Sequence, residues 1–199
     1  MEYFEYRGVE NGVYAEVLTD NAEEITFGEV KEFVGLSEIG KSTASENAPH
    51  YYDNIPAIII SSTGADEIAL NTAGIPLEVV ADITGQYYDE ELGMYVEQER
   101  APKYFALGYI TEKTDGSKVL VWRLKGTFTI PESTHATKDD GTDANGQTLT
   151  YTGISTAHKF TKTGKPAKAV NVDTSKNAVD ATEFFTTVQT PDTVAKAAA

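Results

Sequence analysis

The stretch Lys103–Ile130, KYFALGYITEKTDGSKVLVWRLKGTFTI, decides the fold of this chain. Two runs rich in aromatic and β-branched residues flank the pair Asp115-Gly116. An Asp-Gly pair between alternating apolar runs is the strongest short-range signal of a β-hairpin, because a type I′ turn requires positive φ at both central residues. The sequence therefore predicts one long hairpin across this stretch.

A two-residue turn also predicts which residues face each other in the hairpin, because it places Thr114 opposite Ser117. The pairs that follow are Tyr109–Trp122, Leu107–Leu124 and Lys103–Phe128. One face is then bulky and apolar, with Phe105, Leu107, Tyr109, Leu120, Trp122, Leu124 and Phe128. The other face is smaller and more polar, and it carries Arg123 and Lys125. We expect the Trp122 face to pack into the core.

The composition indicates a single domain with a real core. A length of 199 residues and a hydrophobic fraction of 40% favour one large domain. We expect a β domain over residues 1–190 and a flexible C-terminal tail over residues 191–199. There is no cysteine, so neither a disulfide nor a thiolate metal site is possible. The acidic start lacks the apolar run of a signal peptide, and no run approaches the ~18 residues of a membrane-spanning helix.

The negative charge of the chain is unevenly distributed. Residues 1–100 hold 21 acids and 4 bases, a balance of −17, and residues 101–199 hold 10 acids and 12 bases, a balance of +2, which together give −15. This excess argues against wrapping around nucleic acid, which requires clustered lysine and arginine. The charge either serves solubility alone or lets an acidic half meet a near-neutral half of an identical copy.

Further short elements surround the hairpin. Apolar runs predict strands within residues 13–18, 25–33, 58–60, 146–160 and 183–189, and a second, acidic hairpin within 86–99. The run Ile58–Ile60 is continuous, as in a strand buried on both faces. For residues 64–74 strand and helix both remain open.

The segment 75–85, IPLEVVADITG, is the best helix candidate. Pro76 suits the first turn, Glu78 lies near the positive end of the helix dipole, and Gly85 can form a left-handed C-terminal cap. Its apolar residues share one face, so it should pack on a sheet.

Long polar segments at 37–54 and 131–146 are predicted to be loops, and 161–179 is predicted to be a loop or an extended segment. A loop as long as 37–54 is uncommon in a compact domain and is often functional or mobile. The sum is a mainly β fold, a β-sandwich or Greek-key barrel with one short flanking helix at about 75–84 and long loops.

The search for a metal site gives no candidate that holds. The acidic loop KDDGTDANG resembles a calcium loop, but aligning Gly146 with the required glycine places Gly141 at the first ligand position and Thr152 at the last. The three histidines, His50, His135 and His158, have no zinc-ligand spacing.

Catalytic patterns are also missing, so we predict no catalytic, cofactor-binding or metal-ligating residue. Ser61, Ser62 and Ser155 lack a nucleophile elbow, and no P-loop is present. The acid pair Glu90-Glu91 has no second feature that supports glycosidase chemistry. The lysines between residues 159 and 168 are too sparse for a nucleic-acid footprint. A set of tyrosines, Tyr87, Tyr88 and Tyr95, has the composition of a sugar-stacking platform or of ordinary strand packing.

Two stretches carry a resemblance to a known family. IPLEVVADITG (75–85) is followed by PKYFALGYITEKTDGSKVLVWRLKGTFTIPESTHATKDDGTDANGQTLTYTG (102–153). This succession of short helix, acidic hairpin, long hairpin, acidic loop and Thr-rich strand resembles the major tail protein, or tail tube protein, of long-tailed bacteriophages that infect Gram-positive bacteria.

The resemblance implies a virion structural protein, made in the host cytoplasm, that forms hexameric rings by joining sheets edge to edge. The rings stack into a hollow tube that conducts the genome. Its partners are then further copies of itself and other tail proteins, such as the tape measure, tail terminator and distal tail proteins. DNA passes through the lumen without sequence-specific binding, and no membrane is involved. If the polar face of the hairpin lines this lumen, nearby acids or a subunit contact must offset Arg123 and Lys125.

The alternative is a monomeric carbohydrate-binding β-sandwich module of a phage or bacterial surface protein, which would use the Tyr-rich segment 87–95. An enzyme has no residue constellation to support it.

Overall fold

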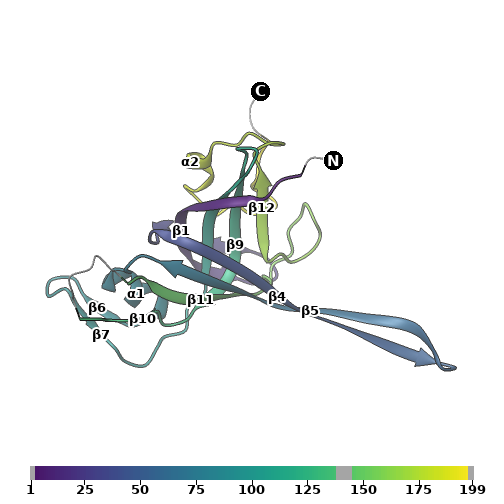
Figure 1. The fold of residues 1–199 in the computed structure, drawn as a ribbon, viewed down its shortest axis with the longest axis horizontal. Coiled ribbons are helices and arrows are strands. Elements are labelled where there is room, and N and C mark those ends of the chain that lie inside the picture. The colour runs from purple at the N-terminus through teal and green to yellow at the C-terminus, as the bar shows by residue number, and fades with distance from the viewer. Residues whose placement is uncertain (1–2, 138–144, 197–199) are drawn as a thin grey trace.

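The computed structural model describes residues 3–137 and 145–196. In this part of the chain, ten strands form one antiparallel sheet, two strands form a small separate sheet, and two helices are short (Figure 1). The strands are β1 (Tyr6–Asp20), β2 (Ile25–Phe27), β3 (Lys31–Glu32), β4 (Leu36–Tyr52), β5 (Ile55–Thr72), β6 (Tyr87–Asp89), β7 (Met94–Val96), β8 (Phe105–Lys113), β9 (Lys118–Phe128), β10 (Glu132–Ser133), β11 (Gln147–Gly153) and β12 (Ala169–Asp173). The helices are α1 (Leu77–Thr84) and α2 (Ala181–Phe184). The predicted mainly β fold with a short flanking helix is confirmed.

The large sheet has the strand order β2-β1-β8-β9-β11-β5-β4, with β3 beside β1, β10 beside β11 and β12 beside β9. On the side away from β8, strand β9 has two partners. Its first part pairs with β12 and its last part pairs with β11. An extra residue in β9 between Arg123 and Gly126 interrupts its register with β8. Such a bulge bends a strand, and here it lies where β9 changes partner. Gly126 permits the close approach, since a Cβ there would lie 2.5 Å from the Thr152 carbonyl oxygen.

The hairpin predicted from the sequence is present as β8 and β9, but its turn is different. Gly116 has a φ of +83°, whereas Asp115 is not among the described residues with positive φ. The Gly116 N–H donates to the Lys113 carbonyl at 2.9 Å, and the Lys113 N–H donates to the Ser117 carbonyl at 2.8 Å. The loop is therefore three residues long, a turn that ends in a left-handed glycine, instead of a two-residue type I′ turn.

This longer loop shifts the predicted register by one residue. Tyr109 lies opposite Val121, and Trp122 lies opposite Gly108. Because side chains alternate across a strand, the shift exchanges the predicted partners between the two faces. Trp122 and Tyr109 consequently point to opposite sides of the sheet and belong to different core clusters.

Two hydrophobic clusters lie on the two faces of the β8–β9 hairpin, so neither face is free. The first cluster contains Tyr14, Phe33, Ile68, Leu70, Ile75, Val80, Ile83, Phe105, Leu107, Tyr109, Val119, Val121, Phe128, Leu149 and Tyr151. The second contains Val13, Ala15, Ala106, Ile110, Leu120, Trp122, Leu124, Phe160, Val172, Phe184, Phe185 and Val188. The first fills the space between the hairpin, β5, β11 and α1, and the second is closed by the C-terminal part of the chain. The Arg123 face, predicted to be available to a lumen or a neighbour, is therefore largely packed inside the subunit.

Helix α1 follows its prediction closely. Pro76 precedes it, Glu78 lies in its first turn, and Gly85 ends it with a left-handed φ of +67°. Asp82 ties the helix to the sheet, because it accepts hydrogen bonds from the Tyr14 hydroxyl at 2.9 Å and the Lys31 ammonium at 2.6 Å.

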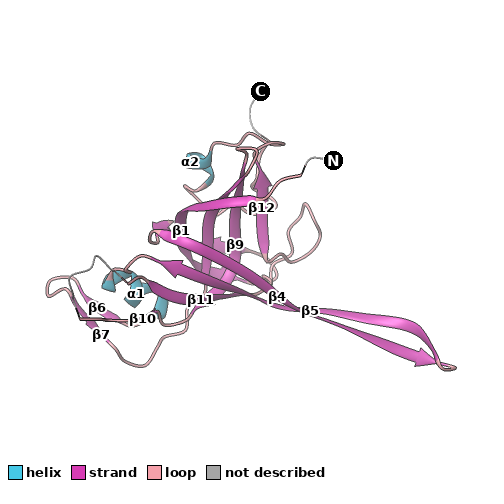
Figure 2. Ribbon diagram, in the orientation of Figure 1, coloured by secondary structure: helices cyan, strands magenta, loops and turns pink. Residues whose placement is uncertain are grey.

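Several other predicted elements are different. The acidic hairpin is confirmed as β6–β7, and residues 64–74 fall largely in β5. The segment 37–54 is not a loop, because it forms most of β4. Residues 161–179, predicted to be a loop or an extended segment, contain the strand β12. The strand predicted for 183–189 is absent from those described residues, where α2 ends and irregular chain follows (Figure 2). The flexibility of residues 191–199 stays a prediction, although Asp192 accepts hydrogen bonds from the Thr161 and Lys162 N–H groups.

Candidate functional site

A long two-stranded hairpin projects from the body and is the most distinctive surface of the protein (Figure 1). The first part of β4 pairs with the last part of β5 inside the large sheet, up to the pair Thr43–Asp66. Beyond that pair the two strands continue together without any further strand beside them in the described chain. We call residues 45–63 the arm. Its eight-residue first strand, from Ser45 to Tyr52, gives it a reach of about 26 Å.

The arm begins at an irregularity in the pairing. The register shifts between Thr43 and Ser45, opposite Gly64. On the body side of this point, β5 alternates buried and exposed residues. On the arm side, every residue from 45 to 63 is exposed except Ala48. A Cβ at Gly64 would lie 3.2 Å from the Ala44 Cβ, so glycine relieves crowding where the arm leaves the body.

The tip of the arm is a two-residue turn. Asp53 has a φ of +51° and Asn54 a φ of +65°, and they connect the pair Tyr52–Ile55. Positive φ at both central residues defines a type I′ turn, whose twist matches that of paired strands. Asp and Asn tolerate this conformation better than other non-glycine residues.

The exposed side chains of the arm are largely apolar. The large ones and their exposed fractions are Tyr51 63%, Tyr52 60%, Ile55 65%, Ile58 51%, Ile59 67% and Ile60 55%. Because neighbouring residues of a strand point to opposite faces, Ile59 lies on one face of the arm and Ile58 and Ile60 on the other. The prediction that Ile58–Ile60 is a strand buried on both faces is therefore wrong in this isolated chain, although its strand conformation is correct.

The edges of the arm lack one common protection against association, an edge lysine, although each strand carries a proline, Pro49 or Pro56. Exposed edge strands commonly carry lysine, which discourages another strand from pairing with them. No lysine or arginine occurs between residues 42 and 99, and the arm has only Glu46 and Asp53 as acids. A long, flat, apolar strand pair with open edges is a surface that associates with another chain.

A group of charged residues lies at the base of the arm. The Asp66 carboxylate has three cationic neighbours, at 3.1 Å from the Lys168 Nζ, 3.4 Å from an Arg123 guanidinium nitrogen and 3.8 Å from the Lys41 Nζ. Burial alone would raise the pKa of Asp66, but hydrogen bonds from Lys168 and Thr43 and the charge of Lys41 outweigh it, so this pKa lies below its ordinary value. The carboxylate therefore stays ionised near neutral pH.

The two bases predicted on the polar face of the hairpin are both paired inside the chain. Arg123 is only 8% exposed and contacts Asp66 as well as the Tyr109 hydroxyl, at 3.2 Å. Lys125 donates to Asp20 at 2.6 Å, and Asp20 also accepts from two backbone N–H groups at residues 157 and 158. The acids that offset these bases thus come from the same subunit.

The residues considered as catalytic or metal-binding candidates lie far apart in the fold. His50 is on the arm, His135 contacts Ser133, and His158 packs edge-on against Phe160. Ser61 donates to the Asn47 side chain on the arm. Among the described residues there is no group of three His, Cys, Asp or Glu side chains that could hold a metal ion. The calcium-like loop lies mostly within residues 138–144, outside the described residues.

The tyrosines of the acidic hairpin do not form one platform. Tyr88 lies opposite Tyr95, and both are half-buried. The Tyr95 hydroxyl donates to Gln86, and its ring packs against the first core cluster. Tyr87, which is 48% exposed, points to the other face. This arrangement favours strand packing over sugar stacking.

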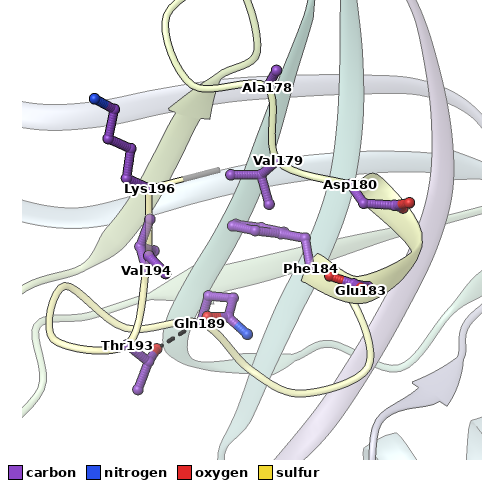
Figure 3. A pocket seen from close by; sticks show the side chains of 10 residues that line it. Ala178, Val179, Asp180, Glu183, Phe184, Gln189, Thr193, Val194 and Lys196 are labelled. Carbon is purple, nitrogen blue, oxygen red and sulfur yellow. Dashed lines mark hydrogen bonds between the residues drawn. The ribbon is translucent and has the colours of Figure 1, made fainter. Parts of the chain in front are cut away.

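A hollow of about 380 Å³ lies between α2 and the C-terminal segment, and Figure 3 shows its lining. Its acids are Asp180 and Glu183, and Asp180 is occupied as the cap of α2, accepting from the Thr182 N–H at 2.7 Å. Val179 and Phe184 line one side of the hollow, and Val194 on the C-terminal segment lies across from them (Figure 3). These contacts hold the C-terminal segment against the second core cluster, which gives the hollow a structural explanation. No helix in the described part of the chain is long and apolar enough to cross a membrane.

The fold and the arm together define a β structural protein with a surface made for association. A family model described as phage tail tube protein matches residues 44–191, a span that includes the arm, α1 and the β8–β9 hairpin. The match covers more than half of the chain, so the chain belongs to the phage tail tube protein family, whose members are structural components of the virion tail. A search of curated proteins found no match.

The arm and the charged group at its base were not predicted from the sequence. Segment 37–54 is polar in composition and lacks the alternating apolar pattern by which a strand that packs on a core is recognised. The signal that was present is Asp53-Asn54, a pair suited to positive φ, between Tyr52 and the isoleucine-rich run that follows.

Proposed function

We propose that this protein self-assembles into stacked hexameric rings that form the tube of a phage tail, the conduit for genome ejection. The observation that carries the proposal is the arm, which exposes large apolar side chains on both faces and leaves both edges unpaired. A subunit alone cannot bury these groups, whereas a neighbouring copy can cover a face and pair with an edge. In the proposed ring the arm contacts a different surface on the next copy, a head-to-tail contact whose rotation between copies closes after six subunits.

The charge supports passage of DNA without retention. The net charge is −15, and the bases of the β8–β9 hairpin are paired with acids of the same chain. A negatively charged wall repels phosphates, so DNA moves through without sequence-specific contacts. The role is structural and not enzymatic. Partners at the ends of the tube are other tail proteins, such as the tape measure, tail terminator and distal tail proteins.

Assembly can be tested with the purified protein at increasing concentration. Sedimentation velocity and negative-stain microscopy should show rings or tubes for the full chain. A variant in which residues 45–63 are replaced by a two-residue Asn-Gly turn should remain monomeric with an unchanged thermal midpoint, because none of the removed side chains is buried in the subunit. A full chain that stays monomeric at high concentration and binds glycans would contradict the proposal and favour the carbohydrate-binding alternative.

A further inference from the structure

The charged group at the base of the arm has more cations than its single buried carboxylate can satisfy. Asp66 is one negative charge among Lys41, Arg123 and Lys168. Two of the three contacts are long, at 3.4 Å for Arg123 and 3.8 Å for Lys41, where a charge-assisted hydrogen bond is about 2.8 Å. The group therefore has capacity for a second anion.

Arg123 also has a donor without an acceptor. Its terminal nitrogens contact Asp66 and the Tyr109 hydroxyl, but its Nε has no hydrogen-bond partner among the described residues, and the residue is 8% exposed. A guanidinium group presents five N–H donors, and an unsatisfied buried donor costs free energy. This Nε is itself buried, so it contributes to the unbalanced positive charge of the group without facing solvent.

A groove of about 530 Å³ gives access to these cations. Strands β1, β4, β8, β9 and β12 form it, and its charged lining residues are Lys41, Arg123 and Glu38. The Glu38 carboxylate accepts from the Asn71 side-chain amide at 2.9 Å. Apolar side chains, among them Val9 and Ile39, make up much of the remaining wall. An acidic side chain entering this groove would meet two cations in a partly apolar setting, where charge pairs are less screened than in water.

The acidic hairpin β6–β7 provides the complementary charge. Residues 86–99 contain Asp89, Glu90, Glu91, Glu97 and Glu99 and no lysine or arginine. Within the described part of the chain, none of these acids forms an ion pair. Figure 1 shows this hairpin and the arm at opposite ends of the molecule. In a head-to-tail assembly, surfaces on opposite sides of the subunit meet in neighbouring copies.

We propose that the tip of the acidic hairpin of one copy, with Glu90 and Glu91, docks in the groove at the base of the arm of the next copy, against Lys41 and Arg123. This inference rests on the proposed self-assembly and names a contact within it. The docking sets the register between neighbouring copies, while the apolar arm supplies most of the association free energy. Charge pairs across an interface contribute in this way to specificity.

A double-mutant cycle tests the contact. The variants are Lys41→Ala, the pair Glu90→Gln with Glu91→Gln, and all three changes together. Each of the first two should raise the protein concentration at half-assembly by about 3- to 10-fold, and the combined variant should raise it no further than the larger single effect. The cycle cancels any effect of removing Lys41 on its own subunit. Multiplicative effects would overturn the docking.

The matched control is the pair Glu23→Gln with Glu24→Gln, which makes the same charge change at exposed acids of another turn. It should change the half-assembly concentration by less than about 2-fold. An effect equal to that of the acidic-hairpin variant would show that only net charge matters and would overturn the inference. If the unmodified chain never assembles, the proposed function fails and this inference with it. If assembly depends on the arm but the cycle shows no coupling, the inference alone fails.

Discussion

Replacing Ile58, Ile59 and Ile60 with threonine should strongly weaken assembly while leaving the subunit folded. Threonine keeps the β-branch and the strand preference, so the arm should retain its shape. The isoleucines are 51%, 67% and 55% exposed, so over half of each side chain is available to a neighbour. Burying a whole isoleucine side chain contributes about 1.5–3 kcal/mol, which gives roughly 1–1.5 kcal/mol for each exposed part and about 3–4.5 kcal/mol for the three.

A loss of this size corresponds to about a hundredfold to a thousandfold higher concentration at half-assembly. Sedimentation velocity over a dilution series measures that concentration, and thermal unfolding of the dilute protein measures subunit stability. The thermal midpoint should be unchanged, because exposed substitutions alter unfolding by only about 0.5 kcal/mol. Ile130→Thr, at a 50% exposed isoleucine outside the arm, is the matched control for the single change Ile59→Thr. Equal effects of these two single variants, or assembly of the triple variant at the original concentration, would refute the role of the arm.

Three further predictions concern the body of the subunit. Gly108→Ala should destabilise it by about 1–3 kcal/mol in urea unfolding, because the added methyl group would lie only 2.7–3.0 Å from three side chains, whereas Gly40→Ala, with nothing within 4 Å, should have little effect. Asp20→Ala should lower the free energy of unfolding by about 2–4 kcal/mol in the same assay, because it leaves two backbone N–H groups and the largely buried Lys125 without their acceptor. The control Glu23→Ala, at an exposed residue of the same turn, should leave the free energy of unfolding nearly unchanged. The hydrogen bond from Lys113 lowers the pKa of Asp173 to about 2, below the unfolded value of about 3.9. The contribution of Asp173 to the stability of the fold is therefore complete above about pH 4 and is lost as the pH falls towards 2. Thermal midpoints measured from pH 5 to pH 2 should therefore fall less steeply for Asp173→Asn than for the original chain, and parallel curves would contradict this linkage.

The hairpin shows how far local sequence signals reach. The aromatic and β-branched runs and the Asp115-Gly116 pair correctly predicted two long strands, because strand preference and turn chemistry act over a few residues. The register depended on whether the loop contains two or three residues. Both loops use a left-handed glycine, and they differ at Thr114 and Asp115, since the longer loop includes Thr114 and has no positive φ at Asp115. This difference in loop length places Trp122 in the second core cluster, on the face opposite to that of Tyr109.

The burial of both faces of the β8–β9 hairpin was also not predicted from the sequence pattern. The smaller face of the hairpin, with Gly108 and Ala106, appeared fit for solvent or a neighbour. In the fold, the indole of Trp122 covers Gly108, where a side chain would collide with it. The small residues thus mark close packing, and the distant segments that pack there, such as Phe185, cannot be located from the hairpin alone.

The arm was not predicted from the sequence because it is exposed on both faces. A strand is recognised by an apolar face that packs on a core, and residues 45–63 pack on no core in their own subunit. The isoleucine run was correctly taken as a strand, but its burial requires another molecule, which intramolecular patterns do not describe. The buried ion pair of Arg123 with Asp66 joins β9 to β5 and was equally out of reach, since it depends on how the sheet closes.

The connectivity of the central sheet sets an order for folding during synthesis. Strand β1 pairs with β8, beginning with Tyr6 opposite Lys113, and β9 must then wait for β12 at residues 169–173. The first hundred residues therefore leave the ribosome with β1 paired only to the short strands β2 and β3, before β8 exists. The arm has no such delay, because its strands are joined by two residues and a hairpin of this kind closes in about 1–10 μs. The arm, like the β1–β2 hairpin before it, is thus able to form before the central strands β8, β9 and β12 complete the sheet.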